Sequence, residues 1–270
     1  MNTNGLRAEG LLLVIMMFLA VCMPAKAWQF YNGSDISSIS SGFVVLEPDN
    51  WSRNDLQQIR NKGSVPLAWL NLSQIEDSRL VPIDIMSKDY AINRRYLPEG
   101  KKLAIFYGQS FKNLVKIRLK EYLLKGFAGV VFAKIGSYSE LSNSPINRSE
   151  MWRLIEEMSA EARRLNSSAL VILHDSADFA AEIKQGQLIS GVLEEGLYFG
   201  RNGRQIRAWD SEKRLKLLKE LHANKRLILL AEDARTESRR QFSVNESQKH
   251  GFDPGFAVLP LNIERKPADD

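Results

Sequence analysis

Short apolar runs recur along the chain from residue 28 onward, separated by longer stretches in which apolar residues have a helical spacing. Several runs consist almost entirely of Val, Ile, Leu, Phe and Ala, the composition of a strand covered on both faces in a parallel sheet. The pattern predicts strands at Trp28–Tyr31, Gly42–Leu46, Val65–Leu70, Leu103–Tyr107, Gly129–Ala133, Ala169–Leu173, Gly191–Leu193 and Leu227–Ala231.

The stretches between the runs predict amphipathic helices over 51–62, 111–125, 151–165 and 212–223. We interpret the charged segment 233–248 as a long loop, and 256–261 as a short closing strand. Eight strands that alternate with helices over residues 28–270 predict one α/β domain, a (β/α)8 TIM barrel. An open doubly wound sheet fits less well, because no glycine-rich phosphate loop follows an early strand.

The first 27 residues differ from the rest of the chain. Leu11–Met23 is an unbroken apolar run, and Ala25-Lys26-Ala27 then places small residues where a signal peptidase reads them. The run is short for a membrane span. We therefore predict a secretory signal peptide at 1–27 and a mature domain at 28–270. An uncleaved membrane anchor and a lipoprotein attached at Cys22 remain as alternatives.

Composition and charge limit the classes of partner, metal and cofactor that we expect for this chain. The single Cys lies in the predicted signal peptide, so the mature chain has no disulfide and needs a large core. With three His and no Cys, we expect no metal site and no cofactor. The net charge is +5, or +4 without residues 1–27, and it is spread along the chain. This favours a general solubility charge, with no nucleic acid as partner and, after cleavage, no membrane span.

The predicted strand tips carry a series of motifs: "FYNG" at 30–33, "FVVLEPDNW" at 43–51, "PLAWLNLSQIE" at 66–76, "KGFAGVVFAKIGSY" at 125–138, "ALVILHDSADF" at 169–179 and "GVLEEGLYFG" at 191–200. In this order and spacing they resemble glycoside hydrolase family 114, the endo-α-1,4-polygalactosaminidases, and the related hydrolase domain that acts on Pel-type polysaccharide. The resemblance runs from about Phe30 to Asn262. It implies a secreted or periplasmic barrel that acts on a galactosamine-containing polymer.

The resemblance also implies where the active-site carboxylates belong, and here the chain departs from the family. Glu195 matches the glutamate of the seventh strand, with Glu194 as a one-residue alternative. The two aspartates usual at the fifth strand are replaced by Ala133 and Gly136, although Ser137-Tyr138 is retained. Glycoside hydrolysis normally needs two carboxyl groups, and alanine cannot transfer a proton.

Two further strand tips depart from the family pattern. The Gly-Glu pair of the third strand is Ser73-Gln74 here, and Gln74 keeps the shape of a glutamate but cannot ionise. Glu76, two residues on, does match. The asparagine usual on the sixth strand falls near His174-Asp175.

Other residues offer replacement acids. Glu47, Asp49, Asp175 and Glu232 lie at predicted strand ends, although Asp49 fits a helix cap equally well. His174 and Asp175 are adjacent in a strand, so only one of them faces the barrel interior. Glu195 itself has an alternative role, as a structural carboxylate paired with Arg or Lys at the barrel rim.

Aromatic residues at or near strand ends offer faces on which sugars stack, with core packing as the alternative for each; they are Tyr31, Trp69, Tyr107, Tyr138 and Tyr198. The predicted site therefore has Glu195 as its catalytic residue. Its binding residues are Tyr31, Glu47, Asp49, Trp69, Gln74, Glu76, Tyr138, Asp175, Tyr198 and Glu232.

Three functions fit the sequence. The first is an exported glycoside-hydrolase-like barrel that binds or helps process an exopolysaccharide, its hydrolase activity weakened or lost. The second is a working endo-glycosidase with relocated acids, and the third is a non-catalytic scaffold in the cell envelope. Charge bears on the ligand, because a partly deacetylated galactosamine polymer is cationic and this chain is basic.

Overall fold

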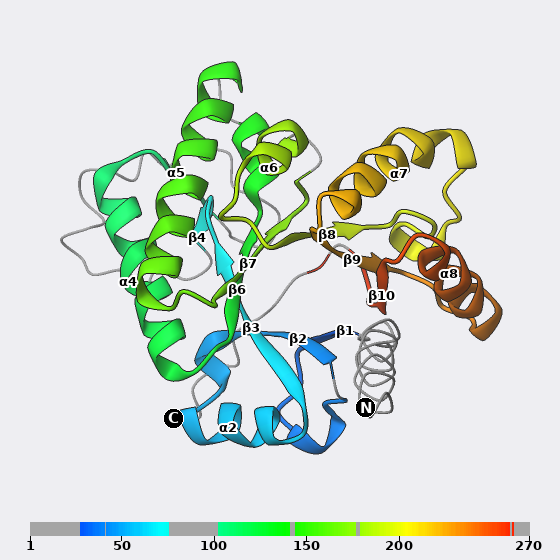
Figure 1. Ribbon diagram of the computed structural model, residues 1–270, viewed down its shortest axis with the longest axis horizontal. Coiled ribbons are helices and arrows are strands. Elements are labelled where there is room, and N and C mark those ends of the chain that lie inside the picture. Colours follow the sequence, from blue (N-terminus) through cyan, green and yellow to red (C-terminus); the bar gives the residue numbers. More distant parts are fainter. Residues whose placement is uncertain are drawn as a thin grey trace, which may run out of the picture.

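The computed structural model describes residues 28–40, 42–75, 102–140, 144–176, 179–259 and 261. Eight parallel strands form one curved sheet with helices around its outside, as Figure 1 shows. The strands, in sheet order, are β1 (Trp28–Tyr31), β2 (Gly42–Leu46), β3 (Ser64–Asn71), β6 (Gly129–Ala133), β7 (Leu170–His174), β8 (Gly191–Glu195), β9 (Leu227–Glu232) and β10 (Asp253–Phe256). This is the predicted TIM barrel.

The side chain of Trp28 joins the first strand to the last two strands. The indole N–H of Trp28, in β1, donates to the carbonyl oxygen of Leu230 at 3.0 Å. Its ring lies against Gly255 in β10, where a Cβ would come within 2.4 Å of the indole. Only glycine leaves room for the ring, so Trp28 and Gly255 together bring the barrel near to closure.

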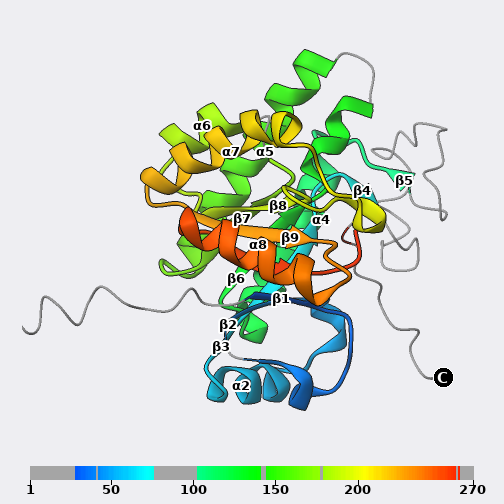
Figure 2. The ribbon, with the colours of Figure 1, turned by 90° about the vertical axis from the view of Figure 1, so that its right-hand side faces the viewer.

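The described α-helices follow the strands along the chain and pack on the outside of the sheet (Figure 2). They are α2 (Arg53–Asn61), α4 (Gln109–Lys125), α5 (Ser144–Leu165), α6 (Ala180–Gln185), α7 (Ala208–Ala223) and α8 (Glu237–Lys249). Because α2, α5, α6, α7 and α8 each follow a parallel barrel strand, the loops that begin these helices gather at the C-terminal ends of the strands, where barrel enzymes place their sites.

The structure corrects three predicted elements. The run 103–107 is not a barrel strand: β5 (Lys102–Leu103) pairs antiparallel with β4 (Gln74–Ile75), and Ala104 and Phe106 then pack beneath the helices. The eighth barrel strand is β10, earlier in the chain than the closing strand predicted at 256–261. The segment predicted as a long loop contains α8, whose N-cap is Thr236. In addition, α5 begins at Ser144, before the predicted start of that helix.

Alternating strand residues divide the core into two clusters. One, which we call the interior cluster, fills the barrel; it comprises Trp28, Val45, Leu67, Trp69, Val131, Ala133, Ile172, Leu193, Leu229, Ala231, Leu259 and Leu261. The other lies between the strands and the helices. Strand position therefore shows which way each side chain at a strand tip points. None of the helices in the described ranges is long and apolar enough to cross a membrane.

Candidate functional site

Two adjacent glutamates end β8 and point in opposite directions. Leu193 belongs to the interior cluster, so Glu195, two residues further on, also faces the interior of the barrel. Val192 packs under the helices, and Glu194 shares that outer face. The alternation resolves the one-residue ambiguity of the sequence in favour of Glu195 as the inward carboxylate.

Glu195 is held by neighbours from three directions. Its Oε1 lies 2.8 Å from Nε2 of His174 and accepts the backbone N–H of Leu261, also at 2.8 Å. The side chain of Lys134 is close enough to act on it electrostatically, and that ammonium donates to the carbonyl oxygen of Leu261 at 3.1 Å. The Glu195 side chain keeps 18% of its surface exposed.

These neighbours decide the charge of Glu195. Burial raises the pKa of this carboxyl group, but the hydrogen bond and charge of His174, the Leu261 N–H and the charge of Lys134 outweigh it, and the net pKa is lowered. Glu195 is therefore an ionised acceptor at neutral pH. In that state it can accept hydrogen bonds from sugar hydroxyls or stabilise positive charge, but it cannot supply a proton.

His174 and Trp69 form the inner wall beside Glu195. Their rings lie 4.9 Å apart between centroids, and Phe30 meets Trp69 edge-on at 5.3 Å. Both His174 and Trp69 are buried, and neither Nδ1 of His174 nor Nε1 of Trp69 has a hydrogen-bond partner among the described residues. Buried polar atoms are nearly always paired, so these two atoms can hydrogen-bond to a bound molecule or water.

The expected second carboxylate is absent at the end of β6, which is the fourth strand of the observed barrel and not the fifth. Ala133, the last residue of β6, pairs with Asn71 of β3 and contributes only a methyl group to the interior cluster. Glu194, Glu195 and Glu232 are the acids that end described barrel strands, and of these three only Glu195 has a strand position that faces inward. Among these described strand-end acids one faces the interior, where hydrolysis normally uses two carboxyl groups.

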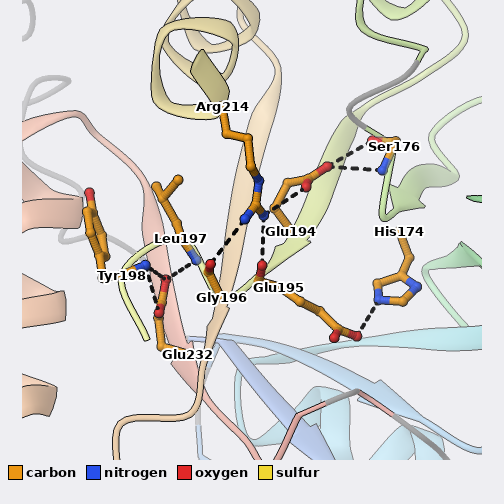
Figure 3. A network of polar contacts seen from close by, with 9 residues as sticks. All are labelled: His174, Ser176, Glu194, Glu195, Gly196, Leu197, Tyr198, Arg214 and Glu232. Carbon is orange, nitrogen blue, oxygen red and sulfur yellow. Dashed lines mark hydrogen bonds and ion pairs between the residues drawn. The ribbon is translucent and has the colours of Figure 1, made fainter. Parts of the chain in front are cut away.

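Glu232, a predicted replacement acid, is buried and stabilises the fold. It ends β9 on the outer face and is fully buried. Its carboxylate accepts the backbone N–H groups of Leu197, Tyr198 and Phe199 at 2.6 to 3.2 Å, as Figure 3 shows for the first two. Burial raises the pKa of Glu232 to about 7 despite these hydrogen bonds. Glu232 fixes the chain that follows β8 and does not face the barrel interior.

Glu194 fixes the same chain from the other side. It accepts the N–H of Ser176 at 3.0 Å and pairs with Arg214 of α7 at 3.3 Å. Arg214 also donates to the backbone carbonyl oxygens of Glu195 and Gly196, at 2.7 and 3.1 Å (Figure 3). Glu194 and Arg214 are therefore positioning residues for the backbone that carries Glu195.

The two acids after β2 belong to a short turn before α2. Oε1 of Glu47 accepts the N–H of Asp49 and begins a 3-10 turn at Pro48–Asn50. Asp49 lies 3.9 Å from Arg118 of α4. The helix-cap alternative for Asp49 is wrong, because Ser52 caps α2 and completes a capping box with Asp55.

Asp175, directly after β7, lies in a different setting. It is exposed, and its backbone has a left-handed φ of +56°. A Cβ at position 136 would lie 3.4 Å from Oδ2 of Asp175. The Asp175 carboxylate thus lies beside Gly136, one of the two positions where the family resemblance implies an aspartate.

The remaining predicted binding residues are spread around the barrel end. Tyr138 is buried against Phe179, and Tyr198 packs against Phe242. The hydroxyl of Tyr31 donates to the Asp35 carbonyl oxygen, and Gln74 donates to the Ser137 hydroxyl at 3.2 Å. Tyr107 is exposed. Glu76 lies outside the described residues.

Sequence reasoning missed Leu261, Ser176 and Arg214. Leu261 acts through its backbone N–H, and no pattern of side chains predicts that contact. Arg214 lies in a helix with several basic residues, and its role depends on the way α7 packs against β8. In the described part of the chain no three His, Cys, Asp or Glu residues are grouped so as to hold a metal ion.

The comparisons with known proteins agree with this architecture. No protein-family model matches the chain. An uncharacterized protein of Methanocaldococcus jannaschii is 21% identical over 266 residues, covering 88% of this chain and 76% of its own length. The glycoside hydrolase domain of PelA from Pseudomonas aeruginosa has a TM-score of 0.71 at 17% identity, covering 86% of this chain and 94% of that domain.

Aspergillus fumigatus Ega3, solved in complex with galactosamine, has a TM-score of 0.67 at 12% identity and covers 90% of this chain and 95% of its own. Such identities show the fold. The resemblance stated from the sequence is therefore confirmed at that level: this chain is a glycoside-hydrolase-like TIM barrel.

Proposed function

We propose that this chain is an exported barrel of glycoside hydrolase family 114 type that binds an exopolysaccharide, with its hydrolase activity weakened or lost. Export follows from the signal peptide predicted at 1–27, which implies a periplasmic or secreted domain. The family assignment rests on the motifs at the strand tips and on the fold shared with the PelA and Ega3 structures.

One observation carries the proposal: among the acids that end described barrel strands Glu195 alone faces the interior, and Ala133 stands where the family resemblance implies its partner. Hydrolysis places two carboxyl groups about 5–5.5 Å apart for retention and about 6.5–9.5 Å apart for inversion. The lowered pKa of Glu195 suits a nucleophile or a ligand-binding anion but not the general acid. The loss of a general acid or base typically costs about 10²–10⁴ in rate.

A second candidate function, a working hydrolase, is favoured by the position of Asp175. Its carboxylate lies beside Gly136, so one lost family aspartate has a neighbour of the same chemistry from the next strand. Asp175 is exposed and can reach solvent or substrate. In this reading Asp175 protonates the leaving oxygen and the ionised Glu195 faces the anomeric carbon.

The test combines binding and reducing-end release with purified residues 28–270. The polymers are galactosamine, N-acetylgalactosamine and acidic polysaccharides, and the variants are Glu195→Gln and Asp175→Asn. Asp49→Asn, the same chemical change at a carboxylate that faces Arg118, is the matched control. We expect binding without release, and at least about tenfold weaker binding in Glu195→Gln, a change of about 1.4 kcal/mol. Asp49→Asn should bind as the wild type does.

Release that Asp175→Asn and Glu195→Gln both abolish would establish the hydrolase instead. Binding that Glu195→Gln leaves unchanged would remove the barrel interior as the binding site. Neither binding nor release with any polymer would support the scaffold function, in keeping with Leu259 and Leu261, which pack into the interior cluster.

A further inference from the structure

Six exposed arginines lie on two neighbouring segments at the C-terminal end of the barrel, the loop after β8 and the loop after β9 together with the first turn of α8. We call them the arginine rim: Arg201, Arg204 and Arg207 after β8, and Arg235, Arg239 and Arg240 after β9. Glu195 ends the strand from which the first loop leaves. The rim and the Glu195 site therefore share one end of the molecule.

The two loops are fastened together. Phe199 and Gln205 form a bridge that makes the first loop a hairpin, and the N–H of Asp233 donates to the carbonyl oxygen of Phe199 at 3.1 Å. Arg239 donates to the carbonyl oxygen of Gly203 at 2.9 Å. Gly203 has a φ of +68°, and a Cβ there would lie 3.2 Å from both arginine side chains that flank it. The backbone that carries the rim is thus held in one arrangement before any ligand binds.

The positive charge of the rim is only partly compensated. Segments 199–210 and 233–241 contain six arginines and three carboxylates, and one of these, Asp233, is buried against Arg235. Within the described residues, Arg201, Arg204 and Arg207 have no carboxylate within ion-pair distance. An unpaired guanidinium offers a planar fork of donors that fits a carboxylate or sulfate.

An aromatic ring accompanies this charge. Trp209, in the first turn of α7, is 68% exposed and lies two residues after Arg207. Exposed tryptophan rings stack on the apolar faces of sugar rings. An exposed indole in the same segment as three unpaired arginines suits a sugar that carries a negative charge.

We propose that the arginine rim binds an anionic polysaccharide through its acidic groups, so that the ligand of this barrel is an acidic glycan and not a cationic galactosamine polymer. The proposal rests on the proposed function, because it takes the bound molecule to be a polysaccharide. A cationic polymer would be repelled by the unpaired arginines. The negative charge of Glu195 does not oppose an acidic chain strongly, because Lys134 and His174 lie against it.

The experiment measures the affinity of residues 28–270 for polygalacturonate at about 50 and about 300 mM NaCl. The test variant is Arg201→Ala/Arg204→Ala/Arg207→Ala. The matched control, Lys112→Ala/Lys116→Ala/Lys120→Ala, removes the same charge from α4, on the opposite side of the barrel from α7 and α8 (Figure 1). We expect the rim variant to lose at least about tenfold in affinity and much of the salt dependence, and the control to lose less than about twofold.

A further variant separates sugar from charge. Trp209→Ala should weaken polygalacturonate binding while binding of inorganic polyphosphate, an anion without sugar rings, stays unchanged. Thermal unfolding of each variant shows whether the fold is intact.

Wild-type affinity in the rim variant would overturn the proposal, and so would preference of the wild type for a galactosamine polymer. Stronger binding of single-stranded DNA or anionic vesicles than of polygalacturonate would overturn the glycan assignment. The proposed function is judged separately: galactosamine-polymer binding that depends on Glu195 keeps it even when the rim proposal fails.

Discussion

The glutamates at the ends of β8 and β9 differ by the face on which they lie. Glu194 and Glu232 lie on the outer face, buried, with Arg214 or backbone N–H groups around their oxygens. Glu195 lies on the inner face, partly exposed, beside His174. The outer pair holds the chain on either side of Glu195, and only Glu195 remains accessible to a ligand. Glutamate thus fixes the backbone on the outer face, and on the inner face it is available to contact a ligand.

The pKa values of these groups follow the same division. Burial raises the pKa of Glu194 and of Glu232, which have little contact with solvent. The pKa of Glu195 is lowered, because His174, the Leu261 N–H and Lys134 outweigh its burial. The accessible glutamate is therefore the one held most firmly in its charged form.

The largest effect should come from Glu232→Ala. Three backbone N–H groups, those of Leu197, Tyr198 and Phe199, would lose their acceptor in a buried place. Each unsatisfied buried group costs about 1–3 kcal/mol, and partial relaxation leaves an expected loss of about 3 kcal/mol in unfolding free energy. Urea denaturation measures it. A loss below that of Glu195→Ala would contradict the structural role of Glu232.

Glu194→Ala should cost less, about 2 kcal/mol. The Ser176 N–H loses a buried acceptor, but Arg214 is a third exposed and can turn to water. Since Arg214 also holds the carbonyl oxygen of Glu195, polysaccharide binding should weaken as well. The same urea series and the binding assay check both effects, and unchanged binding would remove Glu194 as a positioning residue.

The smallest effect is a difference in pH dependence. The folded-state pKa of Glu232 is about 7 against an ordinary value of 4.5, so the folded chain keeps a proton that the unfolded chain has lost. Its contribution to stability is present below pH 4.5 and is lost as pH rises through about 7, with a slope of at most about 1.4 kcal/mol per pH unit.

The contribution of Glu195 to stability changes with pH in the opposite direction. Its lowered pKa gives stability above the ordinary value of 4.5, which is lost as pH falls through the folded-state value. Glu232→Gln should therefore flatten the stability profile between pH 4.5 and 7, and Glu195→Gln should flatten it on the acid side. Thermal melts across pH measure both. Equal profiles for the two variants would contradict the assigned environments.

Much of the barrel could be predicted from the sequence, because a strand buried on both faces is a continuous apolar run. The strands at 28–31, 42–46 and 129–133 have the predicted bounds. Such runs do not show which residues face inward. For that reason the direction of Glu195 required the neighbouring position of Leu193 in the folded barrel.

The errors have equally physical causes. The run at 103–107 is apolar because Ala104 and Phe106 are buried under the helix layer, and burial alone does not distinguish a loop from a strand. Helix α8 was missed because Ser243 and Ser247 form its buried face, which leaves no apolar stripe.

Of the candidate site, the position of Glu195 at a strand end and of Ala133 at another could be predicted from the sequence, and their roles stay predictions. The arginine rim could not, because its two halves are some thirty residues apart in the chain and become one surface only when β8 and β9 pair. Charge that looks evenly spread in the sequence is concentrated by the fold. The backbone contact from Leu261 to Glu195 was beyond prediction for the same reason.

The contacts of Trp28 with Leu230 and Gly255 link the predicted removal of the signal peptide to the folding of the barrel. Its hydrogen bond joins residues 202 positions apart, so it can form only after almost the whole domain has been synthesised. With cleavage after Ala27, as predicted, Trp28 becomes the first residue of the mature domain. Trimming one residue further would then remove the ring that fills the space over Gly255. Loss of Trp28 would therefore remove a packing contact and a hydrogen bond that join the first strand to the last two.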